Sequence, residues 1–157
     1  MDDKTRKIAL RMFTYGAYVI TSKSNRGICA STVTWVTQAS FEPPLITVCI
    51  KAKSETFEIV KDSKKFILHI LSAEQKDFAG SFFKFTEHEN QNINGNSFKL
   101  IDGMPILDSP PVYITCEVIN INEIGDHPLF LAKVIDVKVR EKTDPLELRK
   151  TGWSYGG

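Results

Sequence analysis

The sequence predicts a mainly β protein, a β-barrel with peripheral helices. Short runs rich in Val, Ile, Thr and Phe, bounded by Gly, Pro, Asn and Ser, recur along the chain and are typical of strands. Apolar residues at helical spacing are limited to short segments. Six or more antiparallel-looking strands in 157 residues favour a small closed barrel with helices outside it.

The composition suits one globular domain over residues 1–157. Of these residues 42% are hydrophobic and 25% are charged, a balance that supports a packed core. Lys and Arg total 20 against 19 Asp and Glu, and this net charge of +1 argues against a nucleic-acid backbone as ligand. The opening MDDKTRKIALRMF lacks the features of a secretory signal, and no apolar run reaches the ~20 residues of a membrane span. We therefore expect a cytoplasmic protein.

The chain opens with a helix and a hairpin. Residues 3–15 carry Ile8 and Met12 at helical spacing among basic residues, which predicts an amphipathic helix packed on a sheet. Residues 17–22 and 28–34 read as strands, and the Ser-Asn-Arg-Gly between them is typical of a turn. These two strands should pair as a β-hairpin.

The next elements are a strand, a capped helix and a further strand. We expect residues 38–44 to be irregular, and the near-continuous apolar run 45–50 to be a strand buried on both faces. Ser54 has the character of an N-cap for a helix over 55–61. Residues 66–71 form the following strand.

The second half alternates one helix, one loop and two long strands. A Ser-Ala-Glu-Gln capping box predicts a helix over 72–82. Residues 84–97 are rich in Asn and read as a surface loop, whereas 112–122 and 129–141 read as long strands.

Three segments carry polar residues that suit a ligand. Segment 29–44 is rich in Ser and Thr, whose hydroxyl and backbone groups bind ring atoms or phosphate, although such residues are also ordinary in strands. Segment 51–56 opens a helix beside two lysines, which suits phosphate but also fits a plain N-cap. In segment 125–128, His127 could bind a ligand carbonyl with Asp126 fixing its tautomer, or the pair could only form a turn.

The remaining reactive residues have structural explanations. Cys29, Cys49 and Cys116 lie in apolar runs without zinc or disulfide spacing, so we expect reduced core thiols. His69 lies within a strand and should be structural, whereas His88 lies in a polar loop and should be solvated. The sequence contains no GxGxxG or GxxxxGK[ST] nucleotide motif, and it supports no metal cluster and no catalytic triad.

In this order, the segments resemble the flavin reductase-like family, whose fold is the FMN-binding split barrel with Greek-key-like antiparallel strands. The likeness covers nearly the whole chain. Its matching stretches are Gly-Ala-Tyr-Val-Ile-Thr-Ser at 16–22, residues 27–44 through Phe-Glu-Pro-Pro, residues 51–56, Phe-Ile-Leu-His-Ile-Leu-Ser at 66–72 and Gly-Asp-His-Pro-Leu-Phe at 125–130. The resemblance implies a homodimer that binds FMN, or sometimes FAD, near the subunit interface.

The resemblance also implies which residues form the site. The strand from Ala30 to Thr34 would lie beside the isoalloxazine, with the phosphate held past the next strand. The cofactor-binding residues implied are Ala30, Ser31, Thr32, Val33, Thr34, Gln38, Ala39, Ser40, Lys51, Ser54 and Thr56. His127 would be the catalytic residue on the nicotinamide side, and Trp153 and Tyr155 would cover the flavin or the partner subunit.

The function implied is an NAD(P)H:FMN reductase in which hydride passes from NADH or NADPH to bound flavin. Two alternatives stay open. The first is a flavoredoxin-like electron carrier that a redox protein reduces, and the second is a split-barrel binding module without flavin. For the reductase and for the electron carrier, the partner would be a monooxygenase, a rubredoxin or another electron-transfer protein.

Overall fold

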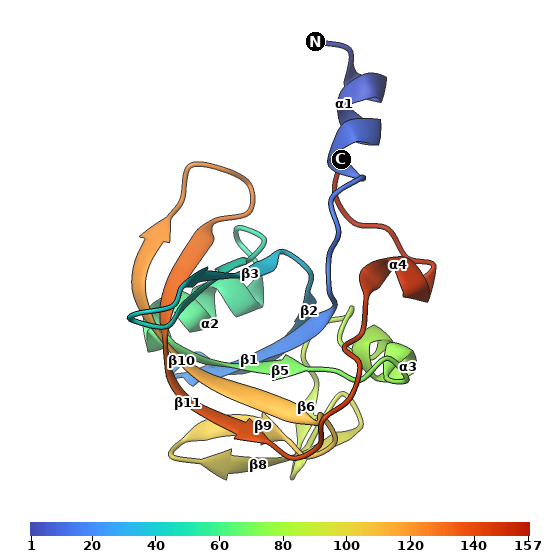
Figure 1. The fold of residues 1–157 in the computed structure, drawn as a ribbon. Coiled ribbons are helices and arrows are strands. Elements are labelled where there is room, and N and C mark those ends of the chain that lie inside the picture. The colour runs from blue at the N-terminus through green and yellow to red at the C-terminus, as the bar shows by residue number, and fades with distance from the viewer.

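The computed structural model describes residues 1–157 and is mainly β, with four short helices at the periphery (Figure 1). Its elements in chain order are α1 (Asp3–Leu10), β1 (Tyr18–Ser24), β2 (Gly27–Val33), β3 (Val36–Ser40), β4 (Leu45–Cys49), α2 (Glu55–Ser63), β5 (Lys65–Ile70), α3 (Lys76–Gly80), β6 (His88–Glu89), β7 (Asn92–Ile93), β8 (Asn96–Ile101), β9 (Met104–Leu107), β10 (Val112–Asn122), β11 (Leu129–Val139) and α4 (Leu148–Thr151). None of the helices has the length and apolar character that crossing a bilayer requires. The predicted fold class is confirmed.

Seven strands form one antiparallel sheet in the order β2-β1-β5-β10-β11-β4-β3. The edge strands β2 and β3 do not pair with each other, so the barrel is split and the expectation of a closed barrel was wrong. Segment 82–86 fills the outer edge of β2 instead. The amide of Thr32 donates to Phe82 O at 3.4 Å, and the amide of Ala30 donates to Thr86 Oγ1 at 3.0 Å. No amide of these two residues is left for a closing strand.

A second sheet of four short strands, β6-β7-β8-β9, occupies part of the region predicted as a loop at 84–97. Asn90, Asn94 and Gly95 all have positive φ, at 52°, 49° and 79°. This backbone conformation closes tight turns, and Asn and Gly adopt it most readily. The Asn-rich composition therefore marks the turns of small hairpins, and the prediction of an irregular loop was wrong there.

The predicted hairpin and the predicted capped helix are confirmed. Strands β1 and β2 pair in antiparallel register from Tyr18 opposite Val33 to Ser24 opposite Gly27. Ser54 is the N-cap of α2, and its side chain accepts a hydrogen bond from the amide of Phe57. Phe57 is 5% exposed and packs edge-on against Phe130 of β11, which joins α2 to the sheet.

Four local predictions differ from the structure. Helix α1 buries no residue and extends away from the sheet beside the C-terminus, so its predicted packing on a sheet was wrong (Figure 1). Residues 36–40 form a strand because they pair with β4, where an irregular segment was predicted. Strand β4 alternates buried and half-buried residues, because α2 and the core cover one face only. The helix predicted over 72–82 is confined to α3, with Gln75 as an N-cap that makes no side-chain capping bond.

The predicted core positions of His69, Cys29 and Cys116 are confirmed, whereas Cys49 is half-buried and lines the cavity described below, so its assignment to the core was wrong. His69 is fully buried; its Nδ1–H donates to Val19 O at 3.1 Å, and its Nε2 accepts from the amide of Leu107 at 3.0 Å. Burial lowers the pKa of His69 to about 3, so the ring is neutral. The three cysteines are free, and burial raises the pKa of Cys29 and of Cys116 to about 12.

Candidate functional site

A cavity of about 750 Å³ lies where the end of β2, the start of α2 and the C-terminal residues meet. Five stretches of the chain contribute to its lining. They are residues 31–35, residues 49–56 except Ala52, residues 82–86, His127, and the C-terminal group of Leu148 and residues 153–155. The volume is within the ~300–1,000 Å³ that is usual for small-molecule sites.

The hydroxyl groups at the end of β2 are mostly used to fix the strand. Ser31 Oγ lies 2.5 Å from Thr56 Oγ1, which links β2 directly to α2. Thr32 Oγ1 donates to Ala79 O at 2.6 Å. These bonds hold the strand against its neighbours and leave Ser31 and Thr32 at the cavity surface with positions already set.

The two residues that follow β2 contain the only buried side-chain polar atoms of the protein that lack a hydrogen-bond partner. These atoms are Thr34 Oγ1 and Trp35 Nε1, and both residues line the cavity. Leaving such a group without a partner costs about 1–3 kcal/mol. A ligand whose ring or chain carries hydrogen-bond acceptors would remove this cost at both atoms.

The start of α2 gives the cavity a cationic end. Lys51 and Lys53 line it and take part in no ion pair, and Glu55 is the only acidic residue of the lining. The first amides of a helix carry a partial positive charge and have no partner inside the helix. Lysines beside a helix start therefore suit a phosphate group.

His127 joins a hydrogen-bonded chain of three side chains, and the loop that carries it is bonded to the segment before α2, since the amide of Ala52 donates to Asp126 O at 2.9 Å. Its Nδ1 is 2.9 Å from Asp126 Oδ1 and its Nε2 is 2.6 Å from the hydroxyl oxygen of Tyr155. The ring of Trp35 packs against both, with centroids 4.6 Å from His127 and 5.5 Å from Tyr155. The hydrogen bond to His127 lowers the pKa of Asp126, whereas burial and then the Asp126 charge raise the pKa of Tyr155.

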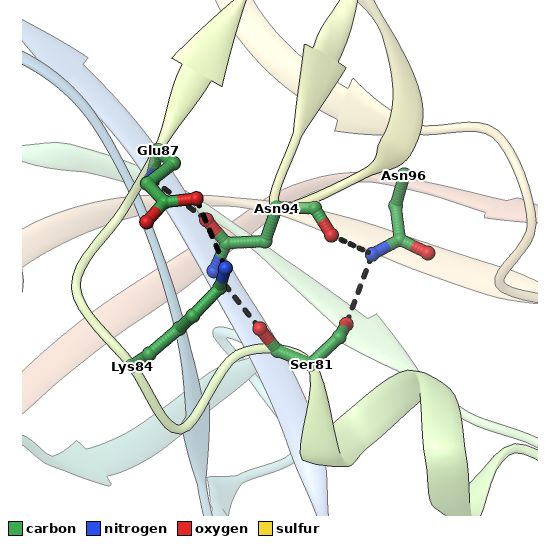
Figure 2. A network of polar contacts seen from close by, with 5 residues as sticks. All are labelled: Ser81, Lys84, Glu87, Asn94 and Asn96. Atoms are coloured by element: carbon green, nitrogen blue, oxygen red, sulfur yellow. Dashed lines mark hydrogen bonds and ion pairs between the residues drawn. The ribbon is translucent and has the colours of Figure 1, made fainter.

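Segment 82–86 is held at both ends by Asn94, as Figure 2 shows. Asn94 Nδ2 donates to Ser81 O at 2.9 Å, and Asn94 Oδ1 accepts from the amide of Glu87 at 2.7 Å. Asn96 Nδ2 adds a bond to Ser81 Oγ at 2.9 Å. The two ends of the segment are thereby fixed by side chains of the small sheet.

The structure brings together eight of the twelve site residues that the resemblance implies. The eight that line the cavity are Ser31, Thr32, Val33, Thr34, Lys51, Ser54, Thr56 and His127. Ala30 is fully buried beside them, with its amide bonded to Thr86 Oγ1. Gln38, Ala39 and Ser40 lie on β3 at the other edge of the sheet, outside the lining.

Sequence reasoning did not select Trp35, Lys53 or the segment 82–86. Trp35 lies inside segment 29–44, which was selected for its Ser and Thr hydroxyl groups and not for its aromatic ring. Segment 82–86 sits between a helix and an Asn-rich region, and its sequence carries no sign that it covers the edge of β2. Trp153 and Tyr155, expected to cover a ligand, do line the cavity.

The split barrel and its cavity have the features of a small-molecule-binding protein, with unpartnered polar atoms that suit a ring and lysines that suit an anionic group. Comparison with known proteins identifies the family. Residues 10–154 match the family described as "Flavin reductase like domain", and the chain belongs to that family.

Relatives and solved structures agree with this assignment. The chain is 28% identical over 141 residues to ferric-chelate reductase (NAD(P)H) of Archaeoglobus fulgidus, covering 88% of this chain and 83% of that protein. It is 29% identical over 134 residues to the 4-hydroxyphenylacetate 3-monooxygenase reductase component of Pseudomonas aeruginosa, covering 82% and 76%. The structure of flavin reductase PheA2 in its native state superposes with a TM-score of 0.79 at 30% identity, covering 99% and 98%.

The residues of the cavity fit a flavin. The unpartnered Thr34 Oγ1 and Trp35 Nε1 can bond to the carbonyl oxygens and ring nitrogens of an isoalloxazine or to ribityl hydroxyls. Lys51, Lys53 and the start of α2 can hold its phosphate. One cavity therefore contains both the groups that can bind the flavin ring and the groups that can bind its phosphate.

Proposed function

We propose that the protein is an NAD(P)H-dependent flavin reductase that holds FMN in this cavity and accepts electrons there from NADH or NADPH. The observation that supports it most directly is the pair of unpartnered buried atoms, Thr34 Oγ1 and Trp35 Nε1, in the same cavity as two unpaired lysines at a helix start. A flavin nucleotide carries acceptors and an anion together. FAD would use the same end of the cavity for its isoalloxazine.

When bound, the flavin supplies the redox chemistry by accepting a hydride from the nicotinamide ring. The residues of this chain bind and orient the two rings, which must approach to about 3–3.5 Å. Thr34 and Trp35 donate to the ring system, and Lys51 with the first amides of α2 holds the phosphate. His127 and Tyr155 form the wall on the nicotinamide side. The hydride step needs no protein acid or base, so the lack of a catalytic triad is consistent with this function.

We further propose that the electrons leave for a redox partner. Relatives that are reductase components of monooxygenases support an electron-transfer role in this family. A monooxygenase, a rubredoxin or another electron-transfer protein would accept them. Phe83 and Phe85 of the cavity lining are 60% and 86% exposed, so the contents of the cavity are within reach of a partner.

A homodimer of single-domain subunits, each formed by residues 1–157, is part of the proposal. Helix α1 exposes Ile8 at 58%, and β11 exposes Ile135 and Val139 at 52% and 59%. A second subunit would remove this apolar surface from water. Light scattering coupled to size exclusion should give twice the 17.7 kDa mass of the chain, and a monomer at all concentrations would contradict it.

An absorbance spectrum tests the proposed function. The purified protein should show flavin bands between ~350 and ~500 nm, where its own side chains do not absorb, and NADH or NADPH should bleach them rapidly without oxygen. Yellow protein that ignores both nucleotides but is reduced by a ferredoxin or rubredoxin would instead be an electron carrier. Colourless protein with no affinity for added FMN would overturn the flavin assignment.

A further inference from the structure

A chain of hydrogen bonds runs from the protein surface to the cavity through Asp126, His127 and Tyr155. The Asp126 side chain is 95% exposed and the His127 side chain is 16% exposed. Tyr155 lies at the cavity end, with its hydroxyl oxygen 2.6 Å from His127 Nε2. Both ring nitrogens of His127 are therefore already hydrogen-bonded. Tyr155 is the residue of this chain whose hydroxyl group lines the cavity and can still make a further hydrogen bond.

The chemistry of Asp126 sets the direction of every bond in this chain. An ionised carboxylate only accepts hydrogen bonds, so Nδ1 of His127 carries the proton and donates to it. In the neutral ring Nε2 then accepts, and the donor must be the hydroxyl of Tyr155. Because the Tyr155 hydroxyl proton is already donated to His127 Nε2, the Tyr155 oxygen can only accept a hydrogen bond from a ligand in the cavity.

The ring of Tyr155 is held in place independently of this bond. Its ring centroid lies 5.5 Å from that of Trp35. The next residue, Gly156, has φ 98°, a conformation that strains any side chain, and a Cβ there would make a tight contact with Trp35 at 3.2 Å. The carbonyl of Gly156 accepts from Arg11 Nε at 3.1 Å. Removing the hydroxyl should therefore leave the ring where it is.

We propose that Tyr155 is a specificity-determining and positioning residue for the nicotinamide nucleotide. Its hydroxyl oxygen accepts a hydrogen bond from a ligand N–H, and so favours the carboxamide –NH2 of NADH or NADPH over analogues that lack this donor. This inference rests on the proposed function, because it assigns a role within the same site. The raised pKa of Tyr155 is consistent with it, since the phenol keeps the proton that it donates to His127.

The preference follows from the cost of an unmet hydrogen bond. A 3-acetyl group in place of the carboxamide keeps the carbonyl oxygen but removes the –NH2 donor. A net hydrogen bond is worth about 1 kcal/mol, which corresponds to about fivefold in kcat/KM. The acetyl compound also differs in its intrinsic redox potential, and this difference cancels when the ratio of the two substrates is compared between variants.

The experiment measures kcat and KM for NADH and for its reduced 3-acetylpyridine analogue in the wild type and in Tyr155→Phe. In the variant, the ratio of kcat/KM for NADH to kcat/KM for the analogue should fall about fivefold. The fall should come from a raised KM for NADH with kcat little changed. Tyr113→Phe is the matched control, because Tyr113 lies on β10 under the guanidinium of Arg140 and outside the cavity lining. An unchanged preference in Tyr155→Phe would overturn the proposal.

A second measurement does not depend on activity. Nitrogen NMR of the imidazole in flavin-free wild-type protein should show the Nδ1–H tautomer of His127, with Nε2 accepting a hydrogen bond that Tyr155→Phe removes. The Nε2–H tautomer would reverse the chain and overturn the proposal even in an active enzyme. A wild type that oxidises neither nucleotide with any flavin would overturn the proposed function and this inference with it, and would be recognised because control and variants are equally inactive.

Discussion

The two sides of the cavity are built in different ways. We name residues 31–35, Lys51 and residues 53–56 the inner wall, and residues 82–86 and 153–155 the outer wall. The inner wall comprises the end of β2, the residues that lead into α2 and the start of α2, with Thr56 3% exposed and the main core cluster behind it. The outer wall has no regular secondary structure, and its aromatic residues Phe83 and Phe85 are 60% and 86% exposed.

This difference indicates how one cavity can hold one nucleotide and exchange another. A wall backed by sheet and core opens only with global unfolding, whereas a wall without regular structure, anchored by the buried Phe82 and exposed from Phe83 to Phe85, opens at lower cost. The inner wall carries the groups proposed for the flavin, and the outer wall carries Tyr155. This division suits the proposed function, in which the flavin is held and the nicotinamide nucleotide is exchanged.

The largest expected effect separates the two walls by stability. Phe57→Ala removes a buried ring from beneath the inner wall and should lower the free energy of unfolding by about 3–5 kcal/mol. Phe83→Ala removes a ring that contacts mainly Trp153, at 4.7 Å, and should cost less than about 1 kcal/mol. Urea denaturation measures both. Equal losses would remove the distinction between the walls.

Acid should act on the sheet behind the inner wall through His69. The pKa of His69 is about 3 in the folded protein against 6.5 for a solvent-exposed histidine, so below pH 6.5 the unfolded chain binds a proton that the folded chain does not bind. The free energy of unfolding should fall by about 1.4 kcal/mol per pH unit from this group as the pH drops from 6.5 towards 3. Denaturation curves at several pH values test this. His69→Gln should flatten the slope, and the exposed control His88→Gln should not.

Lys51 tests the anion end of the inner wall. Lys51→Ala should weaken FMN binding about tenfold, because a charged hydrogen bond contributes about 1.5–3 kcal/mol, while unfolding changes by less than about 0.5 kcal/mol. Titration of the flavin-free protein with FMN gives the dissociation constant. Lys23→Ala, an exposed lysine on β1 outside the cavity, should bind FMN like the parent. Equal affinity in the Lys51 variant would refute the phosphate assignment.

Asn94→Gly should loosen the outer wall alone. Glycine keeps the positive φ of 49° but deletes both side-chain bonds that fix segment 82–86 (Figure 2). We expect a loss of about 1–2 kcal/mol and faster hydrogen exchange in this segment, with unchanged exchange in α2. Asn90→Gly is the control, since Asn90 also has positive φ, at 52°, and makes no side-chain hydrogen bond. Equal exchange in both variants would show that Asn94 does not hold the wall.

The smallest effect concerns the unpartnered hydroxyl of Thr34. Thr34→Val keeps the shape and removes the buried polar atom, so the flavin-free protein should be unchanged or stabilised by up to about 1 kcal/mol. FMN should nevertheless bind a few-fold more weakly, and its thermal shift should be smaller. Thr37→Val on β3 should change neither quantity. A Thr34 variant that loses stability but keeps its FMN affinity would show that the hydroxyl serves folding.

The sequence allowed the inner wall to be predicted because its determinants are local. The Ser-Asn-Arg-Gly turn sets the β1–β2 hairpin, and Ser54 starts α2 through a bond to an amide three residues on. The family resemblance then indicated that these two elements belong to one site. Short-range turn and capping chemistry therefore carried most of the correct prediction.

The outer wall depends on contacts that no local pattern reveals. Asn94 reaches Ser81 across 13 residues, and His127 reaches Tyr155 across 28. The same holds for β3, which is a strand only because β4 lies beside it, and for Gln38, which the sheet places at the edge away from the cavity. Contacts between residues so far apart in the sequence are set by the folded chain and cannot be predicted from the spacing of residues.

The covered edge of β2 also has a consequence for self-association. Its outward amides at Ala30 and Thr32 are already satisfied by segment 82–86, so a strand from another molecule finds nothing to pair with there. The opposite border, β3, has an exposed run from Thr37 to Ala39 and no such cover. Aggregation by strand addition should therefore begin at β3, where an added lysine would be the natural protection.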